Sequence, residues 1–100
     1  MAYKNDVEIK SQTLYLANRH EKDKRRVDIR VVDWIVNGKH TPLLEKRDFY
    51  QNDMGEWRLG KAKGFNAGDL DLLQDHWQDI KDALTGKAKA AASTTVVEPF

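Results

Sequence analysis

Residues 55–65, with the sequence GEWRLGKAKGF, combine residue types suited to binding a nucleic acid rather than to catalysis. An aromatic residue lies near either end of the stretch, and Arg58, Lys61 and Lys63 lie between them. Cations neutralise phosphate groups, aromatic rings stack on unpaired bases, and glycines let a phosphate backbone approach the main chain. The stretch therefore predicts one strand of a surface for single-stranded nucleic acid.

Catalytic and metal-binding motifs do not appear in the sequence. The three histidines lie far apart, and there is no H-E-x-x-H motif, nucleophile elbow or phosphate-cradling glycine loop. His76 and Asp79 could share a helix face, but this pair lacks the third ligand that a metal site needs. The aspartates of GDLDLLQD are better explained by helix-terminus electrostatics. We therefore expect neither an enzyme nor a metal ion or other cofactor.

The composition indicates a single small globular domain. The chain has 100 residues, of which 40% are hydrophobic, and it has no cysteine, which excludes a disulfide framework and thiolate chemistry. No signal peptide and no apolar run of membrane-spanning length appears. We expect a protein without a membrane partner in the cytoplasm, or in the host cytoplasm if the source is viral.

The net charge of +1 conceals an uneven distribution. Residues 1–63 contain 14 Lys or Arg against 10 Asp or Glu, whereas residues 66–84 contain one Lys against five Asp. A basic first part and an acidic second part predict a polarised molecule with one side that faces a polyanion.

Alternating hydrophobic and polar residues predict four strands. The first covers residues 7–16, and the charged residues 17–25 after it are expected to form a loop. The second covers residues 26–36, and its two faces carry Val27, Ile29, Val31 and Ile35 on one side, and Arg26, Asp28, Arg30 and Trp34 on the other.

Turn residues connect these strands to two more. Asn37-Gly38 is a strong hairpin signal because both positions tolerate a positive φ. A third strand is predicted over residues 43–50, and a turn that ends at Gly55 leads into the fourth strand. The short connections predict an antiparallel meander.

One amphipathic helix is predicted after the strands. Asn66 is a good N-cap, Asp69 and Asp71 suit the first turns, and Gly86 suits the C-terminal end. An apolar stripe recurs every three or four residues, at Leu70, Leu73, Trp77, Ile80 and Leu84, and Leu72 and Ala83 broaden it. The predicted fold is α+β with the order ββββα over residues 1–85, followed by a flexible tail over residues 86–100.

Residues 45–80 resemble the positive cofactor 4 family of transcriptional coactivators and its bacterial and viral relatives. The shared order is a strand that ends in arginine and aromatic residues, an acidic turn, a Gly-Glu-aromatic start, a Gly-basic-Gly segment, a polar cap and one amphipathic helix. The resemblance covers the C-terminal half well, and the N-terminal strands by topology alone. It implies a ββββα subunit that dimerises through its helix and binds single-stranded DNA with little sequence preference.

The resemblance also implies roles for individual residues. Arg47 matches a phosphate-contacting arginine, and Tyr50 matches a base-stacking aromatic. Lys61 and Lys63 fall on a basic pair between two glycines, although LGKAKG is one residue longer than the usual spacing. Trp34 is the best counterpart of a second stacking aromatic, although the turn that follows makes the alignment ambiguous there.

The residues themselves support such a surface independently. Arg30 and Trp34 share a strand face, and Trp57, Lys61 and Lys63 have the same parity on the fourth strand. The predicted nucleic-acid contacts are Arg30, Trp34, Lys39, Lys46, Arg47, Tyr50, Trp57, Arg58, Lys61 and Lys63. The predicted dimer interface is the helix stripe of Leu70, Leu73, Trp77, Ile80 and Leu84.

Structural explanations compete with these roles. Trp57 could pack in a core with Leu59 and Phe65, and Trp34 could be a core or interface residue. Lysines on a strand also protect an edge against aggregation. The spacing of the helix stripe does not decide whether it packs against its own sheet or a second subunit.

The C-terminal residues Glu98, Pro99 and Phe100 predict a partner-recruiting tail. A terminal phenylalanine after proline is similar to the tip through which bacterial and phage single-stranded DNA-binding proteins recruit replication partners, but only one acidic residue precedes it here. The alternative is an unstructured end. Deletion of Phe100 should then weaken partner recruitment and leave DNA affinity unchanged.

The sequence therefore predicts a homodimer that binds single-stranded DNA without strong sequence preference in replication, recombination or transcription. Replication or transcription proteins are expected partners of the tail. Two alternatives stay open: an RNA-binding or transcription-regulating member of the same fold, and a dimeric protein-interaction module without nucleic-acid binding.

Overall fold

The computed structural model describes residues 8–86 and 97–99. Its elements are β1 (Ile9–Lys22), β2 (Arg25–Val36), β3 (Lys39–Gln51), β4 (Trp57–Lys63), α1 (Ala67–Asp75), α2 (Trp77–Leu84) and β5 (Val97–Pro99). The strands form one antiparallel sheet in the order β4-β3-β2-β1-β5. The predicted four-stranded meander followed by a helical segment is confirmed, but the helical segment consists of two short helices.

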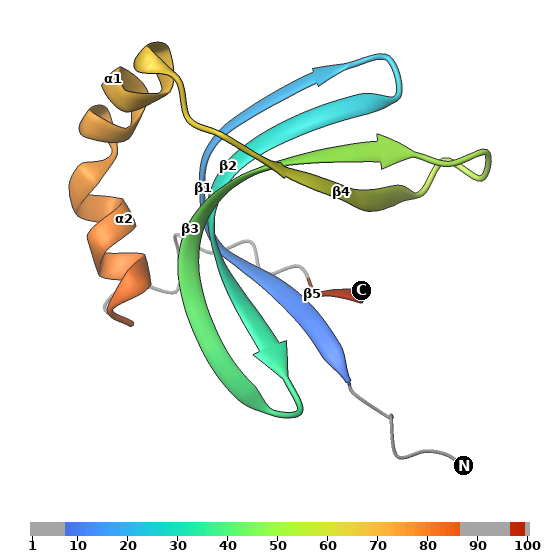
Figure 1. Ribbon diagram of the computed structural model, residues 1–100, viewed down its shortest axis with the longest axis horizontal. Coiled ribbons are helices and arrows are strands. Elements are labelled where there is room, and N and C mark those ends of the chain that lie inside the picture. Colours follow the sequence, from blue (N-terminus) through green and yellow to red (C-terminus); the bar gives the residue numbers. More distant parts are fainter. Residues whose placement is uncertain (1–7, 87–96, 100) are drawn as a thin grey trace.

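The sheet is strongly bent, and α1 and α2 lie on its convex side (Figure 1). Ile29 and Val31 of β2 pack on that side against Leu73, Ile80 and Ala83 of the helices. We call this side of the sheet the helix face and the opposite side the concave face. Because successive residues of a strand point to opposite faces, the polar residues between these apolar ones belong to the concave face.

Both β1 and β3 are longer than the sequence predicted. Residues 17–22, expected in a charged loop, extend β1 to Lys22, and the chain then turns at Asp23, which has a φ of 57°. Asp tolerates this left-handed conformation. Pairing with β2 makes the charged segment a strand, since Arg19 stands opposite Asp28 and forms an ion pair with it. The loop prediction was wrong because the complementary charges lie on the neighbouring strand.

The predicted hairpin at Asn37-Gly38 is confirmed. The two residues have φ values of 50° and 83°, and they join β2 directly to β3. The second predicted turn also forms, and Gly55 adopts a φ of 79° there. Both turns hold glycine where a side chain would be strained.

A bulge interrupts the pairing of β3 with β4. Ala62 stands opposite Arg47, whereas Leu59 stands opposite Phe49, so two residues of β4 face the single residue Asp48. Gly60 lies within the bulge, where an added Cβ would be 2.7 Å from the Asp48 carbonyl oxygen. The glycine here makes room for the neighbouring strand.

The predicted N-cap is confirmed, but the single helix is not. The Asn66 side chain accepts a hydrogen bond from the Asp69 backbone N–H, and the Asp69 carboxylate accepts one from the Asn66 N–H, which completes a capping box. The helix is interrupted at His76, whose φ of −109° and ψ of 13° are not helical. Gly86 follows α2 with a φ of 78°, as expected of a C-terminal stop.

The end of the chain contributes β5, which pairs with residues 10–12 of β1 and places Glu98 opposite Ser11. Residues 87–96 and Phe100 lie outside the described residues, and so does the predicted contact of Phe100 with a partner. Among the described residues, no helix has the length and apolar character needed to cross a membrane.

Candidate nucleic-acid interface

The polar face predicted for β2 exists, but its centre is buried. Arg26, Asp28, Arg30 and Trp34 lie on the concave face, as their alternation predicted. The side chains of Arg30 and Asp28 are 0% exposed. Charged groups this deeply buried need partners, because burial of an unpaired charge costs several kcal/mol or about 20 kcal/mol in the idealised limit.

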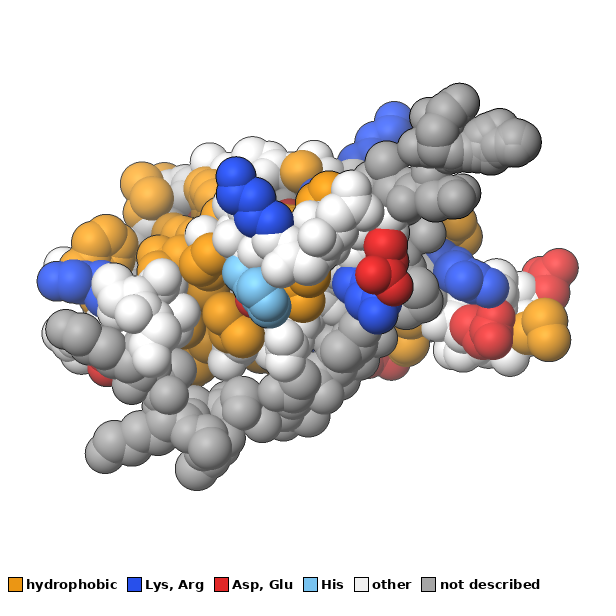
Figure 2. Space-filling view, turned by 90° about the horizontal axis from the view of Figure 1, so that it is seen from below, with side chains coloured by type: hydrophobic (Ala, Val, Ile, Leu, Met, Phe, Trp, Pro, Cys, Tyr) orange, Lys and Arg blue, Asp and Glu red, His pale blue; other side chains and the backbone are white. Residues whose placement is uncertain are grey.

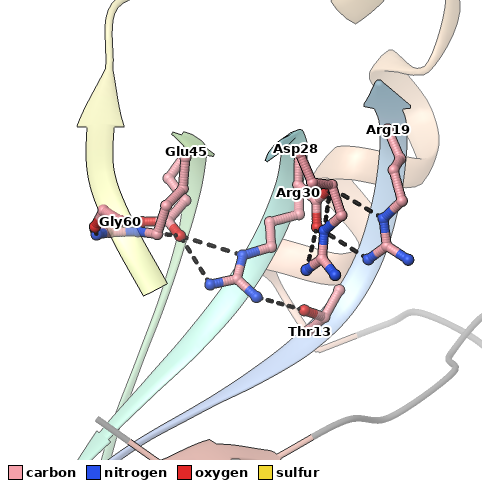
Figure 3. A network of polar contacts seen from close by, with 8 residues as sticks. Thr13, Arg19, Asp28, Arg30, Glu45 and Gly60 are labelled. Carbon is pink, nitrogen blue, oxygen red and sulfur yellow. Dashed lines mark hydrogen bonds and ion pairs between the residues drawn. The ribbon is translucent and has the colours of Figure 1, made fainter. Parts of the chain in front are cut away.

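Arg30 has partners on both neighbouring strands (Figure 3). Its Nε and Nη2 atoms donate to Glu45 Oε2 on β3, at 3.1 and 3.0 Å. Its Nη1 atom donates to Thr13 Oγ1 on β1, at 2.7 Å. The guanidinium therefore joins three strands at the centre of the concave face.

Asp28 is paired with two arginines. Arg19 donates to both carboxylate oxygens through Nε and Nη2, each at 2.9 Å. Arg26 donates to Oδ1 through Nε at 3.1 Å, and its Nη2 lies 3.1 Å from Oδ2. Figure 3 shows the carboxylate between β1 and β2, within reach of Arg19.

Arg47 completes the network on the side of β4. It donates to both carboxylate oxygens of Glu45, each at 3.0 Å, and to the Gly60 carbonyl oxygen at 2.9 Å. Within the part of the chain that the structure describes, Arg19, Arg26, Arg30 and Arg47 pair with the carboxylates of Asp28 and Glu45.

Aromatic rings lie against three of these arginines. The Cζ atom of Arg47 lies over the Trp34 ring, 5.2 Å from its centroid. Arg26 lies over Phe49 at 4.1 Å and over Trp57 at 5.0 Å, while Arg30 is 5.1 Å from Phe49. Trp34 and Trp57 are half-buried, whereas Phe49 is buried. Guanidinium planes and rings therefore alternate across β2, β3 and β4, each held at a distance suited to a cation–π contact.

The predicted binding residues are divided between the two faces. Arg30, Trp34, Arg47 and Trp57 lie on the concave face, whereas Lys46, Tyr50, Arg58 and Lys63 lie on the helix face. Trp57 and Lys63 were predicted to share a face, and this was wrong because the bulge reverses the alternation between them. Lys39 and Lys61 are exposed, with Lys39 next to the β2–β3 turn.

Lys46 is engaged in holding the fold. Its Nζ atom donates to Asp69 Oδ2 at 2.6 Å, with both side chains largely buried. This hydrogen bond, and that from the Asn66 backbone N–H, hold the pKa of the Asp69 carboxyl below its ordinary value of 3.8. The pair fastens the first turn of α1 to β3, so Lys46 has an anionic partner already.

Tyr15 of β1 contacts both His76 and Asp79. Tyr15 Oη lies 2.6 Å from His76 Nδ1 and donates to Asp79 Oδ2 at 3.2 Å. Desolvation, together with the Asp79 charge and its hydrogen bond to the hydroxyl, raises the pKa of Tyr15 above 10.0. Within residues 8–86, no group of three potential metal ligands occurs. The contact fastens the helix interruption to the sheet.

Arg19 and Arg26 are site residues that the sequence analysis missed. Arg19 fell in the expected loop, and Arg26 was placed on the polar face without a role. Continuing the alternation of β1 past Leu16 and pairing it across the Asp23 turn would have brought Arg19 opposite Asp28. Complementary charges across a two-residue turn were therefore the signal.

Part of the predicted dimer stripe belongs to the core of the single chain. Leu73 and Ile80 are buried against the sheet, and Leu84 packs beside them. Ile80 is only 2% exposed and is therefore buried within a single subunit. Leu70 and Trp77 remain 60% and 56% exposed.

The exposed part of the stripe forms a shallow apolar cavity of about 390 Å³, lined by Leu70, Leu73, Gln74 and Trp77. Seen from below, hydrophobic side chains gather toward the end of the molecule where the helices lie (Figure 2).

Comparison of the chain with protein-family models, with curated proteins and with solved structures found no match.

Proposed function

We propose that this protein binds single-stranded DNA without strong sequence preference, on the concave face of its sheet, as a homodimer of positive cofactor 4 type. The role that follows is to protect or present single strands in replication, recombination or transcription.

The alternation of guanidinium groups and aromatic rings on the concave face is the observation that carries this proposal. Flat cations and rings are the surfaces on which unpaired bases stack, at roughly 1 to 3 kcal/mol per base. A duplex hides the faces of its bases, so a stacking surface favours single strands. Contacts to base faces and phosphates carry no base-edge information, and weak sequence preference follows.

In this proposal, the half-buried residues of the concave face have a different role from the buried residues at its centre. The half-buried Trp34 and Trp57 meet the bases, and Arg47, between them on β3, contacts both ligand and scaffold. The buried Arg30 with Glu45 keeps the stacking surface in one geometry. A surface organised before binding loses less entropy when the ligand arrives.

Dimerisation rests on Leu70 and Trp77. Both are exposed on the outer side of the helices, and together with Leu73 and Gln74 they leave an apolar cavity that a second copy would cover. A second copy is the occupant that the resemblance implies, and it would double the stacking surface available to one DNA strand.

The test is fluorescence anisotropy of a labelled thymine oligomer of about 25 nucleotides, with protein added at several salt concentrations. We expect the single strand to bind, and duplex DNA of equal length not to displace it. A plot of log affinity against log salt concentration should fall with a slope of about 0.7 per neutralised phosphate. Absence of binding at low salt would remove the proposal.

Two other outcomes separate the alternatives. Tighter binding of RNA than of DNA of equal length would favour an RNA-binding member of the same fold. A dimer that binds neither would favour a protein-interaction module.

A further inference from the structure

A second cavity, of about 350 Å³, lies on the helix face and is distinct from the concave face. Four of the lining residues form a row across the sheet: Asn18 stands opposite Ile29, Ile29 opposite Lys46, and Lys46 opposite Lys63. His20 and Val27 form the next pair along β1 and β2, and Asp69 of α1 closes one side. The cavity therefore spans four strands beneath the first turn of a helix.

The lining divides into an apolar floor and a polar rim. The half-buried Val27 presents aliphatic surface to the cavity, and Ile29, which also lines it, is buried. Asn18, His20 and Lys63 line the same space, are exposed, and make no side-chain hydrogen bond or ion pair with the rest of the described chain. These three groups are available to a ligand.

The charge of the cavity is positive and off-centre. Lys46 and Asp69 neutralise each other in an ion pair of 2.6 Å. Lys63, on the edge strand β4, is the remaining cation besides any charge on His20. An anionic group is therefore favoured at the β4 side, and an uncharged, flat group over the aliphatic floor.

We propose that this cavity binds one nucleotide, an unpaired base together with its phosphate. The base lies on Val27 beside the His20 ring, the Asn18 amide hydrogen-bonds the base edge, and Lys63 contacts the phosphate. The volume is at the lower end of the roughly 300 to 1,000 Å³ found for ligand pockets, which suits a ligand of this size.

The position of the cavity connects it to the proposed function, on which this inference rests for its natural ligand. β4 is an edge strand, and its successive residues Ala62 and Lys63 belong to the concave face and the helix face. A DNA strand that leaves the concave face and passes around the edge strand β4 would meet Lys63 on the helix face of β4. The cavity would then hold a nucleotide that has left the stacking surface.

The experiment titrates the full chain with thymidine 5′-monophosphate and monitors binding by ¹H–¹⁵N NMR chemical shifts. Thymidine and inorganic phosphate are titrated separately as the two fragments of this probe. We expect the monophosphate to shift the signals of Asn18, His20 and Lys63, with weaker binding of each fragment. Lys63→Ala and His20→Ala should each weaken binding about five- to tenfold, as loss of one charged or stacking contact does. Lys81→Ala, the same charge change on α2, should have no effect.

Failure of this inference is separable from failure of the proposed function. If the 25-nucleotide oligomer binds but the monophosphate shifts only concave-face signals, the cavity is not a nucleotide site. Equal affinities for inorganic phosphate and for the monophosphate would show that the base does not contribute to binding, and would overturn the proposal. Saturable monophosphate binding at His20 would support the cavity even if no oligomer binds. Thermal melts identify a variant that is misfolded, and Lys63→Glu then replaces Lys63→Ala.

Discussion

The guanidinium group of Arg47 lies over the indole ring of Trp34 while it donates hydrogen bonds to Glu45 and to the Gly60 carbonyl oxygen. One side chain of β3 thereby positions an aromatic ring of β2 and the backbone of β4. The stacking surface and the hydrogen-bond network both depend on the guanidinium group of Arg47. A change in the hydrogen-bond network should therefore alter the stacking surface.

Glu45 should be important for stability, because Arg30 is fully buried against it. Breaking a buried ion pair from one side costs about 3 to 5 kcal/mol. We expect Glu45→Gln to lower the free energy of unfolding by about that amount, measured by urea denaturation. Glu56→Gln is the control: Glu56 pairs with Arg58 on the surface, where loss costs about 0 to 1 kcal/mol. Equal effects of the two changes would show that the buried network contributes nothing special.

Leu70 and Trp77 should hold the two subunits together. The double variant Leu70→Ser/Trp77→Ser removes apolar surface that one chain leaves exposed, so it should reduce the dimer to a monomer with an unchanged circular dichroism spectrum. Sedimentation equilibrium measures the mass. Met54→Ser, a change at another exposed hydrophobic residue, should leave the dimer intact. A parent protein that is already monomeric would refute this interface.

Gly60 should not tolerate a side chain. In Gly60→Ala the new Cβ would lie 2.7 Å from the Asp48 carbonyl oxygen and still closer to its carboxylate. We expect a loss of about 1 to 3 kcal/mol in the free energy of unfolding, as for other overpacked sites. Gly64→Ala is the matched control because no other atom lies within 4 Å of its added Cβ. If both variants unfold alike, the close packing of the bulge is not what selects glycine.

Asp69 should make stability depend on acid pH. Its pKa is lowered in the folded protein, so its charged form stabilises the fold above pH 3.8, and this contribution is lost as the pH falls through the lower, folded-state pKa. The Tm of Asp69→Asn should therefore lie below that of the parent at neutral pH and approach it as the pH falls below 3.8. Asp71→Asn, an exposed neighbour, controls for the change in helix charge. Parallel curves for Asp69→Asn and the parent would contradict the assignment.

Local signals predicted much of the fold. Asn37-Gly38 fixed a hairpin, Asn66 with Asp69 fixed a helix start, and the alternation of residues 26–36 separated the two faces of β2 correctly. Each of these features depends on neighbours in sequence, which is why the sequence sufficed.

The features that the sequence did not reveal depend on neighbours in space. The charged end of β1 is a strand because β2 supplies Asp28 opposite Arg19. The parity of β4 changes because two of its residues, one of them Gly60, stand opposite the single residue Asp48 of β3. The helix is interrupted at His76, where Tyr15 hydrogen-bonds its ring. Similarly, Arg30 is buried because strands on both sides supply partners, which the polar pattern of β2 alone could not indicate.

Tryptophan fluorescence can show directly whether DNA binds the concave face. Trp34 and Trp57 lie on that face, and Trp77 lies on α2. A thymine oligomer of about 25 nucleotides should quench the fluorescence of Trp77→Phe, which keeps the two concave-face rings, and leave that of Trp34→Phe/Trp57→Phe unchanged at concentrations where the parent is saturated. Quenching confined to Trp77, or binding with no quenching in Trp77→Phe, would contradict the concave face as the DNA-binding surface.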